Sequence, residues 1–235
     1  MFDNLLTAGE FRISFWVMPL FYQHNINEQT KLAVWHITES ENFFLSQVPL
    51  QRDITHPHKR LQHLAGRYIL RLLFPDFPFE LIRIATTKKP YLPGEAFHFS
   101  ISHCGDYAAA IVSTNQRVGI DIEIPTPKVA RIRHKFLHAV EWEAIEGSST
   151  YIEQNADADM TRKLTLLWSA KEAVFKWYGN GEVDFSEHIR LERFGLNAED
   201  SGIMQASFLK EKVVHLSLPY ITFDGLCLVW VATGK

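Results

Sequence analysis

Two acidic residues stand two positions apart in the apolar segment Gly119-Ile120-Asp121-Ile122-Glu123. In a strand, residues two apart share a face, so Asp121 and Glu123 would project their carboxylates together. Neighbouring carboxylates repel each other, and a hard divalent cation relieves that repulsion. The pattern therefore favours a site for Mg²⁺, with Mn²⁺ as an alternative ion. An ordinary half-exposed strand with acidic outer residues explains the pentapeptide equally well.

A second pair of charged side chains lies in a predicted helix. Apolar residues recur at helical spacing from Thr165 to Tyr178, and Gly179-Asn180-Gly181 follows as a C-cap. Glu172 and Lys176 are four residues apart, so both lie on one face of this helix. Such pairs are common on solvent-facing helices. Here the apolar neighbours leave little polar surface, so we expect the pair to face a cleft and to add a carboxylate and an ammonium to the predicted metal site.

A third group of side chains could bind an anion. Ser102 and His103 end a predicted strand that alternates from Phe97, and Lys89 stands before Pro90 in a turn-rich segment. Hydroxyl, imidazole and ammonium groups all donate hydrogen bonds to phosphate. A serine hydrolase is disfavoured, because adjacent strand residues point to opposite faces and the sequence has no nucleophile elbow. In the alternative interpretation, His103 caps the turn.

The elements that must position these groups alternate between helical and extended patterns. A helix is predicted after Pro57, with Arg60 and Arg67 among its basic residues, and a basic helix after Pro127. Residues 147–161 read as an exposed loop. Strands are predicted at 31–37, 81–85, 97–102, 107–113 and 117–124, the last three as an antiparallel meander with Ile124 in the core, and near 205–209, 213–218 and 226–232. This order predicts an α+β fold of two similar halves, residues 1–114 and 115–235, with the site in the cleft between them.

The composition limits the class of protein. The chain has 235 residues and a formal charge of −3, and 46% of its residues are apolar, which is enough to build a sizeable core. The acidic balance disfavours long nucleic-acid contacts. No apolar stretch approaches the roughly 20 residues of a membrane span, and the start lacks a secretory signal, so we expect a cytoplasmic protein. Cys104 and Cys227 have no metal-ligand spacing, and a zinc site at His56, His58 and His63 is discounted on the same ground.

In their order and separation, these motifs resemble those of the 4′-phosphopantetheinyl transferases, in particular the two-half, monomeric Sfp type. The resemblance runs from about Lys59 to Glu192 and rests on Lys89-Pro90, Phe99 to Cys104, Gly119 to Glu123, and Trp168 to Lys176. Lys88, Ser100 and Cys104 stand where the family usually has glycine, asparagine and serine. None of these departures removes a charged or metal-binding group.

The resemblance implies a pseudo-twofold α+β fold with antiparallel sheets and packed helices, and coenzyme A bound between the halves. It also implies three sets of residues: Asp121, Glu123 and Glu172 for Mg²⁺; Lys89, Ser102, His103 and Lys176 for the phosphates of coenzyme A, to which we add Arg60 and Arg67; and Glu172 and Lys176 for catalysis.

The implied reaction is attack by a serine of an apo acyl or peptidyl carrier protein on the phosphorus that carries the pantetheine arm. The product 3′,5′-adenosine bisphosphate leaves, and the base is either Glu172 or metal-bound water. Because such carriers are acidic, a basic segment is expected to dock them; a solvated helix face is the alternative. This segment contains Lys128, Arg131, Arg133 and Lys135.

Two rival functions remain at this point. A divalent-metal nuclease could also use these acidic residues, but it would have no use for the anion pocket at Ser102 and His103. A module that binds coenzyme A or a carrier without catalysis would not need all three carboxylates together with Lys176.

Overall fold

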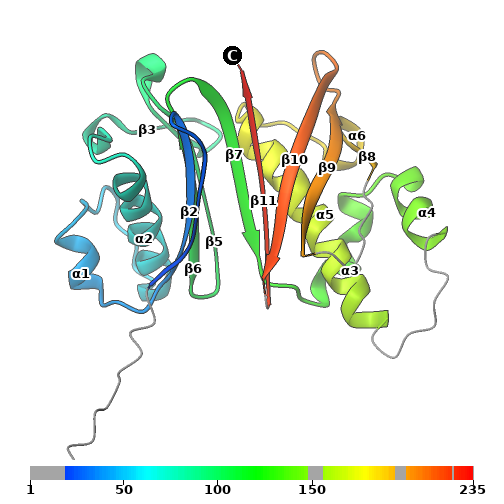
Figure 1. Cartoon of the computed structure of the whole chain (residues 1–235), viewed down its shortest axis with the longest axis horizontal. Helices are drawn as coiled ribbons and strands as arrows, with labels where there is room; N and C mark the ends of the chain where they lie inside the picture. The colour runs from blue at the N-terminus through cyan, green and yellow to red at the C-terminus, as the bar shows by residue number, and fades with distance from the viewer. Residues whose placement is uncertain (1–18, 148–155, 194–199, 224, 235) are drawn as a thin grey trace, which may run out of the picture.

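Two antiparallel sheets pack against each other in a computed structural model that describes residues 19–147, 156–193, 200–223 and 225–234 (Figure 1). The first sheet has the order β1 (Leu20–Asn27), β2 (Thr30–His36), β6 (Tyr107–Ser113) and β5 (His98–Cys104). The second has the order β7 (Gln116–Glu123), β11 (Leu226–Gly234), β10 (Val214–Phe223), β9 (Ser201–Phe208) and β8 (Ile189–Arg193). The predicted α+β class, with antiparallel sheets and packed helices, is confirmed. The strands of the first sheet thus end before residue 114 and those of the second begin after 115, while the division into halves 1–114 and 115–235 stays a prediction.

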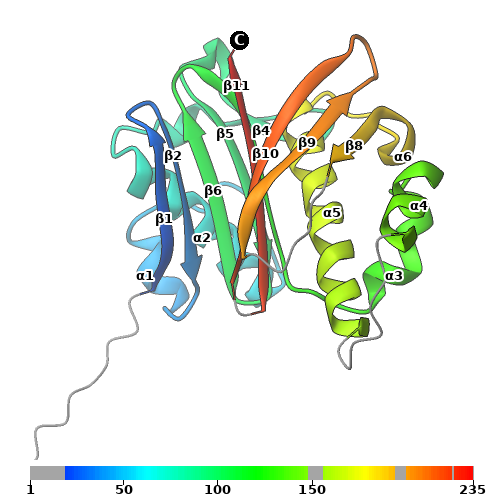
Figure 2. The same ribbon diagram turned by 45° about the vertical axis from the view of Figure 1, so that its right-hand side comes forward.

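Helices cover the outer face of each sheet (Figure 2). The first sheet carries α1 (Glu41–Leu45) and α2 (Pro57–Leu73), and the second carries α5 (Ala156–Tyr178), with α3 (Lys128–Ile132), α4 (Ala139–Gly147) and α6 (Phe185–His188) beside it. Helix α2 begins with Pro57, whose missing N–H costs nothing in the first turn, and ends before Pro75. Two short strands, β3 (Arg83–Ile84) and β4 (Pro90–Tyr91), and the 3₁₀ turns η1 (Phe79–Leu81), η2 (Pro93–Glu95) and η3 (Arg133–Lys135) complete the described elements.

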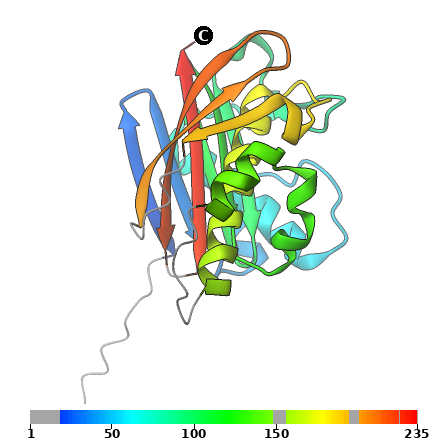
Figure 3. The same cartoon turned by 90° about the vertical axis from the view of Figure 1, so that its right-hand side faces the viewer.

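The apolar core consists of three layers, because the strands β2, β6, β7 and β11 are largely buried on both faces. Leu64 and Ile69 of α2 pack on the first sheet, and Leu167 and Val174 of α5 pack on the second. Between the sheets lies a third cluster that contains Leu32, Val34, Ala109, Ile111, Val118, Ile120, Ile122, Leu226, Leu228 and Trp230. In Figure 3 the helices beside the second sheet, in green and yellow, face the viewer and lie in front of its strands. Burial of both sheet faces holds the two sheets in contact.

Strand β7 is correctly predicted as a strand, but the predicted meander is wrong. The strand does not pair with β6; it pairs antiparallel with β11, with Asp121 opposite Val229, and so belongs to the second sheet. An alternating pattern identifies a strand, but it does not identify the pairing partner. Ile124 is also not in the core, because it follows the end of β7 and is 38% exposed.

Two other predicted elements differ in extent. The basic helix after Pro127 is divided into α3, η3 and α4, with Val140 60% exposed. Helix α5 begins at Ala156, inside the predicted loop 147–161, of which 148–155 lie outside the described residues. Asp159 lies in its first turn, where a carboxylate interacts favourably with the helix dipole. The Lys163 ammonium is 2.7 Å from Asp159 Oδ2. Among the helices that the structure describes, none is long and apolar enough to span a membrane.

Candidate functional site

The site forms where the edge strands β5 and β7 of the two sheets lie side by side. The Ser100 hydroxyl of β5 accepts a hydrogen bond from the Ile120 amide of β7 at 3.2 Å. Helix α5 crosses β7 closely at Gly119, where an added Cβ would lie 2.1 Å from the Ala173 carbonyl oxygen and 2.7 Å from the Trp177 nitrogen. Gly119 therefore allows the helix to bring its charged face to the seam between the sheets.

Three side chains meet at the centre of this seam. The Lys176 ammonium from α5 is 2.6 Å from Asp121 Oδ1 of β7 and 2.8 Å from the Ser102 hydroxyl of β5. Ser102 in turn donates to Asp121 Oδ1 at 2.8 Å. Asp121 is 2% exposed, and its second oxygen, Oδ2, is buried without a hydrogen-bond partner. Residues from both halves of the sequence thus form one polar cluster with an unused acceptor oxygen.

Glu123 and Glu172 lie in the electric field of the same aspartate. The pKa of each carboxyl is raised to about 7, first by burial and then by repulsion from Asp121. The Lys176 ammonium acts in the opposite direction on both groups, and a hydrogen bond from Trp168 lowers the pKa of Glu123. The three carboxylates are therefore close enough to disfavour one another's charge.

The carboxylates of Asp121, Glu123 and Glu172 could serve as ligands of a hard divalent cation. Their oxygens repel one another, and Asp121 Oδ2 has no hydrogen-bond partner. Within the ranges that the structure describes, however, no three His, Cys, Asp or Glu side chains form a ready-made metal-ligand group. The role of Asp121, Glu123 and Glu172 in binding a metal therefore stays a prediction.

Two of the predicted phosphate-binding residues flank the cluster. His103 follows Ser102 at the exposed end of β5, and its pKa is lowered mainly by desolvation and also by the Lys176 ammonium. The Lys89 ammonium donates to the Lys176 carbonyl oxygen at the end of α5. Burial, and then repulsion from Arg117, lower the pKa of Lys89 to about 8. Both residues thus place donors beside Lys176 from the first half of the chain.

The two arginines added to the phosphate site have other partners. Arg60 forms an ion pair with Glu41 at 2.8 Å. Arg67 is 5% exposed, donates to the Gln51 side chain at 3.1 Å and lies 3.0 Å from His63 Nδ1. Their hydrogen bonds go to residues of the first half rather than to the cluster at Asp121, so their role in binding phosphate stays a prediction.

A cavity of about 210 Å³ opens next to Lys176 between the two halves. The segment before β4 forms one wall, where the Thr87 hydroxyl donates to the Gly179 carbonyl at 3.1 Å. Strand β5 forms a second wall with Phe99, Ser100 and Ile101. The sequence gives no periodic signal for this contact between residues 87 and 179, which are far apart in the chain.

Sequence reasoning also missed a buried ion pair behind the site. The Lys171 ammonium is 2.7 Å from Glu141 Oε2 and donates to the Phe185 and Ile189 carbonyls at 3.0 and 2.8 Å. The Leu191 amide donates to the other oxygen of Glu141 at 2.7 Å. This network joins α4, α5 and β8 next to Glu172. Lys171 was visible in the sequence, but nothing in the spacing points to a partner 30 residues earlier.

One segment of the chain matches the model of a known family. The model of the 4′-phosphopantetheinyl transferase superfamily matches residues 117–217, a segment that contains Asp121, Glu123, Glu172 and Lys176. This segment, 101 of the 235 residues, is thus similar to that superfamily.

Curated relatives extend the similarity beyond this segment. The chain is 34% identical over 124 residues to enterobactin synthase component D of Escherichia coli (strain K12), an alignment that covers 50% of this chain and 54% of the relative. It is 27% identical over 192 residues to the L-aminoadipate-semialdehyde dehydrogenase-phosphopantetheinyl transferase of Xenopus laevis, covering 73% of this chain and 62% of the relative. The chain therefore spans about half the length of the curated relatives it matches.

Proposed function

We propose that this protein transfers the 4′-phosphopantetheine arm of coenzyme A to a serine of an apo acyl or peptidyl carrier protein and releases 3′,5′-adenosine bisphosphate. The observation that carries this proposal is the buried cluster of Lys176, Asp121 and Ser102 at the seam between the sheets. Asp121 and Lys176 lie inside the segment matched to the superfamily, and the relative from Xenopus laevis is named as a phosphopantetheinyl transferase.

Coenzyme A would lie between the two halves. Lys176 would bind the diphosphate, with Ser102 and His103 donating from the end of β5 and Lys89 from the segment before β4. The cavity of about 210 Å³ beside Lys176 offers space for part of the nucleotide. An ammonium that is now paired with Asp121 would then be shared with the diphosphate oxygens.

Asp121, Glu123 and Glu172 would hold Mg²⁺ or Mn²⁺, which would neutralise charge on the diphosphate. The partnerless oxygen of Asp121 and the raised pKa values of both glutamates support this assignment. The chain's own residues then bind and align the phosphoryl group, which is the main requirement of such transfers.

The carrier serine must lose a proton as it attacks phosphorus. Glu172 would accept it, directly or through a water molecule; because a carboxylate that also holds a cation is a weak base, the route through water remains open. The phosphorus–oxygen bond to the adenosine bisphosphate breaks, and Lys176 stabilises the charge that develops on the leaving phosphate.

The carrier would dock on the exposed basic residues of α3 and η3. Lys128, Arg131, Arg133 and Lys135 are all exposed there, next to the C-terminal end of the metal-binding strand. Acidic carriers would be steered to this surface at low ionic strength. We propose an Sfp-type enzyme of two halves that acts as a monomer in the cytoplasm.

The direct test is mass spectrometry of apo carrier proteins incubated with the protein, Mg²⁺ and coenzyme A. The expected result is a carrier that gains one phosphopantetheine, and no gain in the presence of EDTA. Glu172→Gln should abolish transfer without unfolding the chain, whereas Glu143→Gln, on the exposed face of α4, should transfer at the wild-type rate.

Two other outcomes would contradict this function and indicate another one. Cleavage of nucleic acid with unmodified carriers would identify a divalent-metal nuclease. Binding of coenzyme A or of a carrier, with no transfer to any carrier of a broad panel, would identify a binding module.

A further inference from the structure

Lys88 has a backbone conformation that lysine rarely adopts. It lies in the turn between β3 and β4, which is closed by the Lys88 amide donating to the Ala85 carbonyl at 2.8 Å and the Ala85 amide donating to the Lys89 carbonyl at 2.9 Å. Hairpin loops of this length commonly end in a residue with positive φ, and the φ of Lys88 is 66°. Glycine adopts this conformation without strain, and the family that the sequence resembles usually has glycine here. A lysine at this position therefore lowers the stability of the turn.

The folded chain gives the Lys88 side chain no contact that would offset this strain. The residue is exposed. Among the residues that the structure describes, its ammonium forms neither an ion pair nor a hydrogen bond. Residues held in unfavourable backbone conformations gather at ligand-binding sites, so the position is a candidate for contact with a ligand.

Lys88 lies at the cavity of about 210 Å³ that we assign to part of coenzyme A, where it is one of the lining residues. The residues on either side of it are fixed to the end of α5. The Thr87 hydroxyl donates to the Gly179 carbonyl at 3.1 Å, and the Lys89 ammonium donates to the Lys176 carbonyl. The turn thus holds Lys88 at the rim of the cavity from both sides.

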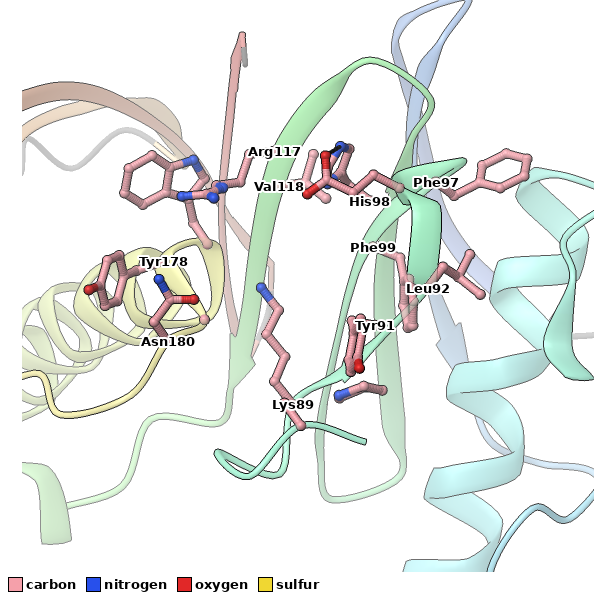
Figure 4. Close-up of a pocket in the computed structure, with 15 residues that line it drawn as sticks. Lys89, Tyr91, Leu92, Phe97, His98, Phe99, Arg117, Val118, Tyr178 and Asn180 are labelled. Atoms are coloured by element: carbon pink, nitrogen blue, oxygen red, sulfur yellow. Dashed lines mark ion pairs between the residues drawn. The ribbon is translucent and has the colours of Figure 1, made fainter. Parts of the chain in front are cut away.

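The charge of this rim suits a phosphate group. Lys88, Lys89 and Lys176 line the cavity, and none of its described lining residues is acidic. Figure 4 shows the Lys89 side chain extending into the space between the end of α5 and Phe99 of β5. Lys89 is bonded to a carbonyl, and Lys176 is paired with Asp121. Lys88 is therefore the lysine of the rim whose charge has no partner among the described residues, and a lysine ammonium readily binds phosphate as a point charge.

We propose that Lys88 is a specificity-determining residue of the coenzyme A site and that its ammonium binds a phosphate group of coenzyme A. This inference rests on the proposed function and adds to it a cation outside the residues already assigned to the phosphates. Coenzyme A carries phosphate in two places, the diphosphate and the 3′-phosphate, and an ammonium recognises both by the same chemistry. Lys88 thus lowers the stability of the turn and raises the affinity for coenzyme A.

Isothermal titration calorimetry of the full chain with coenzyme A and Mg²⁺ tests the proposal. Lys88→Gln keeps the length of the side chain and removes its charge, so it should weaken binding about two- to fivefold, as expected for an exposed ion pair. The difference from the wild type should shrink at high salt. Lys212→Gln removes the same charge from an exposed residue outside the cavity and should bind coenzyme A like the wild type.

A titration with 3′-dephospho-coenzyme A distinguishes the two phosphate groups. If the weakening caused by Lys88→Gln disappears with this ligand, Lys88 binds the 3′-phosphate. If the weakening persists, Lys88 binds the diphosphate.

Thermal unfolding tests the strain at the same residue. Lys88→Ala and Lys88→Gly both remove the ammonium, but only glycine relieves the left-handed conformation. Lys88→Gly should therefore melt roughly 2–4 °C above Lys88→Ala, while both variants should bind coenzyme A as weakly as Lys88→Gln does.

Three results would each overturn the proposal: equal affinity for coenzyme A in the wild type and Lys88→Gln, equal weakening in Lys88→Gln and Lys212→Gln, or equal melting temperatures of Lys88→Ala and Lys88→Gly. A wild-type chain that does not bind coenzyme A would contradict the proposed function, and this inference with it. Binding that is independent of Lys88 would contradict this inference alone, so the two failures can be told apart.

Discussion

Replacing Gly119 by alanine would disturb the closest approach between α5 and β7. The added Cβ would lie 2.1 Å from the Ala173 carbonyl oxygen, against about 3.4 Å for an ordinary contact, and the obstacle is backbone that cannot rotate away. The helix would have to withdraw by about 1 Å. Overpacking of this kind costs ~1–3 kcal/mol, which in a chain of this size lowers the melting temperature by roughly 2–12 °C.

The same displacement should affect the chemistry more than the stability. Glu172 and Lys176 both lie on α5, so withdrawal of the helix moves them away from Asp121. A misplacement of about 1 Å can cost about 10²-fold in rate. We therefore expect Gly119→Ala to lose roughly this factor in transfer of phosphopantetheine, measured by mass spectrometry under initial-rate conditions.

Gly234→Ala is the matched control for this substitution. Gly234 lies on β11, the strand paired with β7, and an added Cβ there meets no atom within 4 Å. Both substitutions reduce the freedom of the unfolded chain by the same amount, so the difference between them reports the contact alone. If Gly119→Ala matches Gly234→Ala in both melting temperature and transfer rate, the close approach does not position the site.

Three further predictions concern stability, pH and docking. Lys171→Met should destabilise the fold by ~3–5 kcal/mol in urea unfolding, because the Glu141 carboxylate is left buried without its cation; combining it with Glu141→Leu should recover most of the loss, and a double variant as unstable as the single one would contradict this. The pKa of Glu172 is raised to about 7 from 4.5, so the folded chain keeps a proton that the unfolded chain releases. The free energy of unfolding in EDTA should therefore fall as pH rises from 4.5 to about 7, and an equal fall in Glu172→Gln would refute this cause. Reversing Arg131 and Lys135 to glutamate should raise KM for the carrier, less so at high salt, with KM for coenzyme A unchanged in steady-state kinetics; a parallel rise in both KM values would argue against docking.

Local patterns in the sequence predict individual elements well. The strand at 107–113 agrees with β6, and the helix after Pro57 agrees with α2. Alternation and helical spacing follow from the geometry of one element, so they can be recognised from neighbouring residues alone. β1 and β8 were not predicted. Each pairs with the next strand along the chain, β1 with β2 and β8 with β9, and this pairing stabilises strands whose own pattern is weak.

The partner of a strand is harder to predict than the strand itself. Strand β7 follows β6 after a short turn, which is typical of a hairpin, yet it pairs with β11 at the end of the chain. The face of β7 with Val118, Ile120 and Ile122 packs on the first sheet, while Gly119 on its other face meets α5, and only the complete arrangement shows this. The sequence alone does not show which strand β7 pairs with.

In the candidate site, too, the sequence predicts the position of some residues and not of others. Asp121 and Lys176 carry recognisable chemistry and spacing, and the structure places them 2.6 Å apart. Arg60 and Arg67 were chosen for their charge alone, and their ion pair and hydrogen bonds are local. The charge of an arginine does not predict where its long side chain points when the sequence shows no partner for it.

The triangle of Ser102, Asp121 and Lys176 also has a consequence for experiments on this protein. Its bonds are among those that tie β5, β7 and α5 to one another, so the atoms proposed to handle the diphosphate also fasten the two halves together. Substituting one of these residues should weaken the contact between the two sheets as well as the reaction. An inactive variant at these positions is informative only when its melting temperature is measured together with its rate.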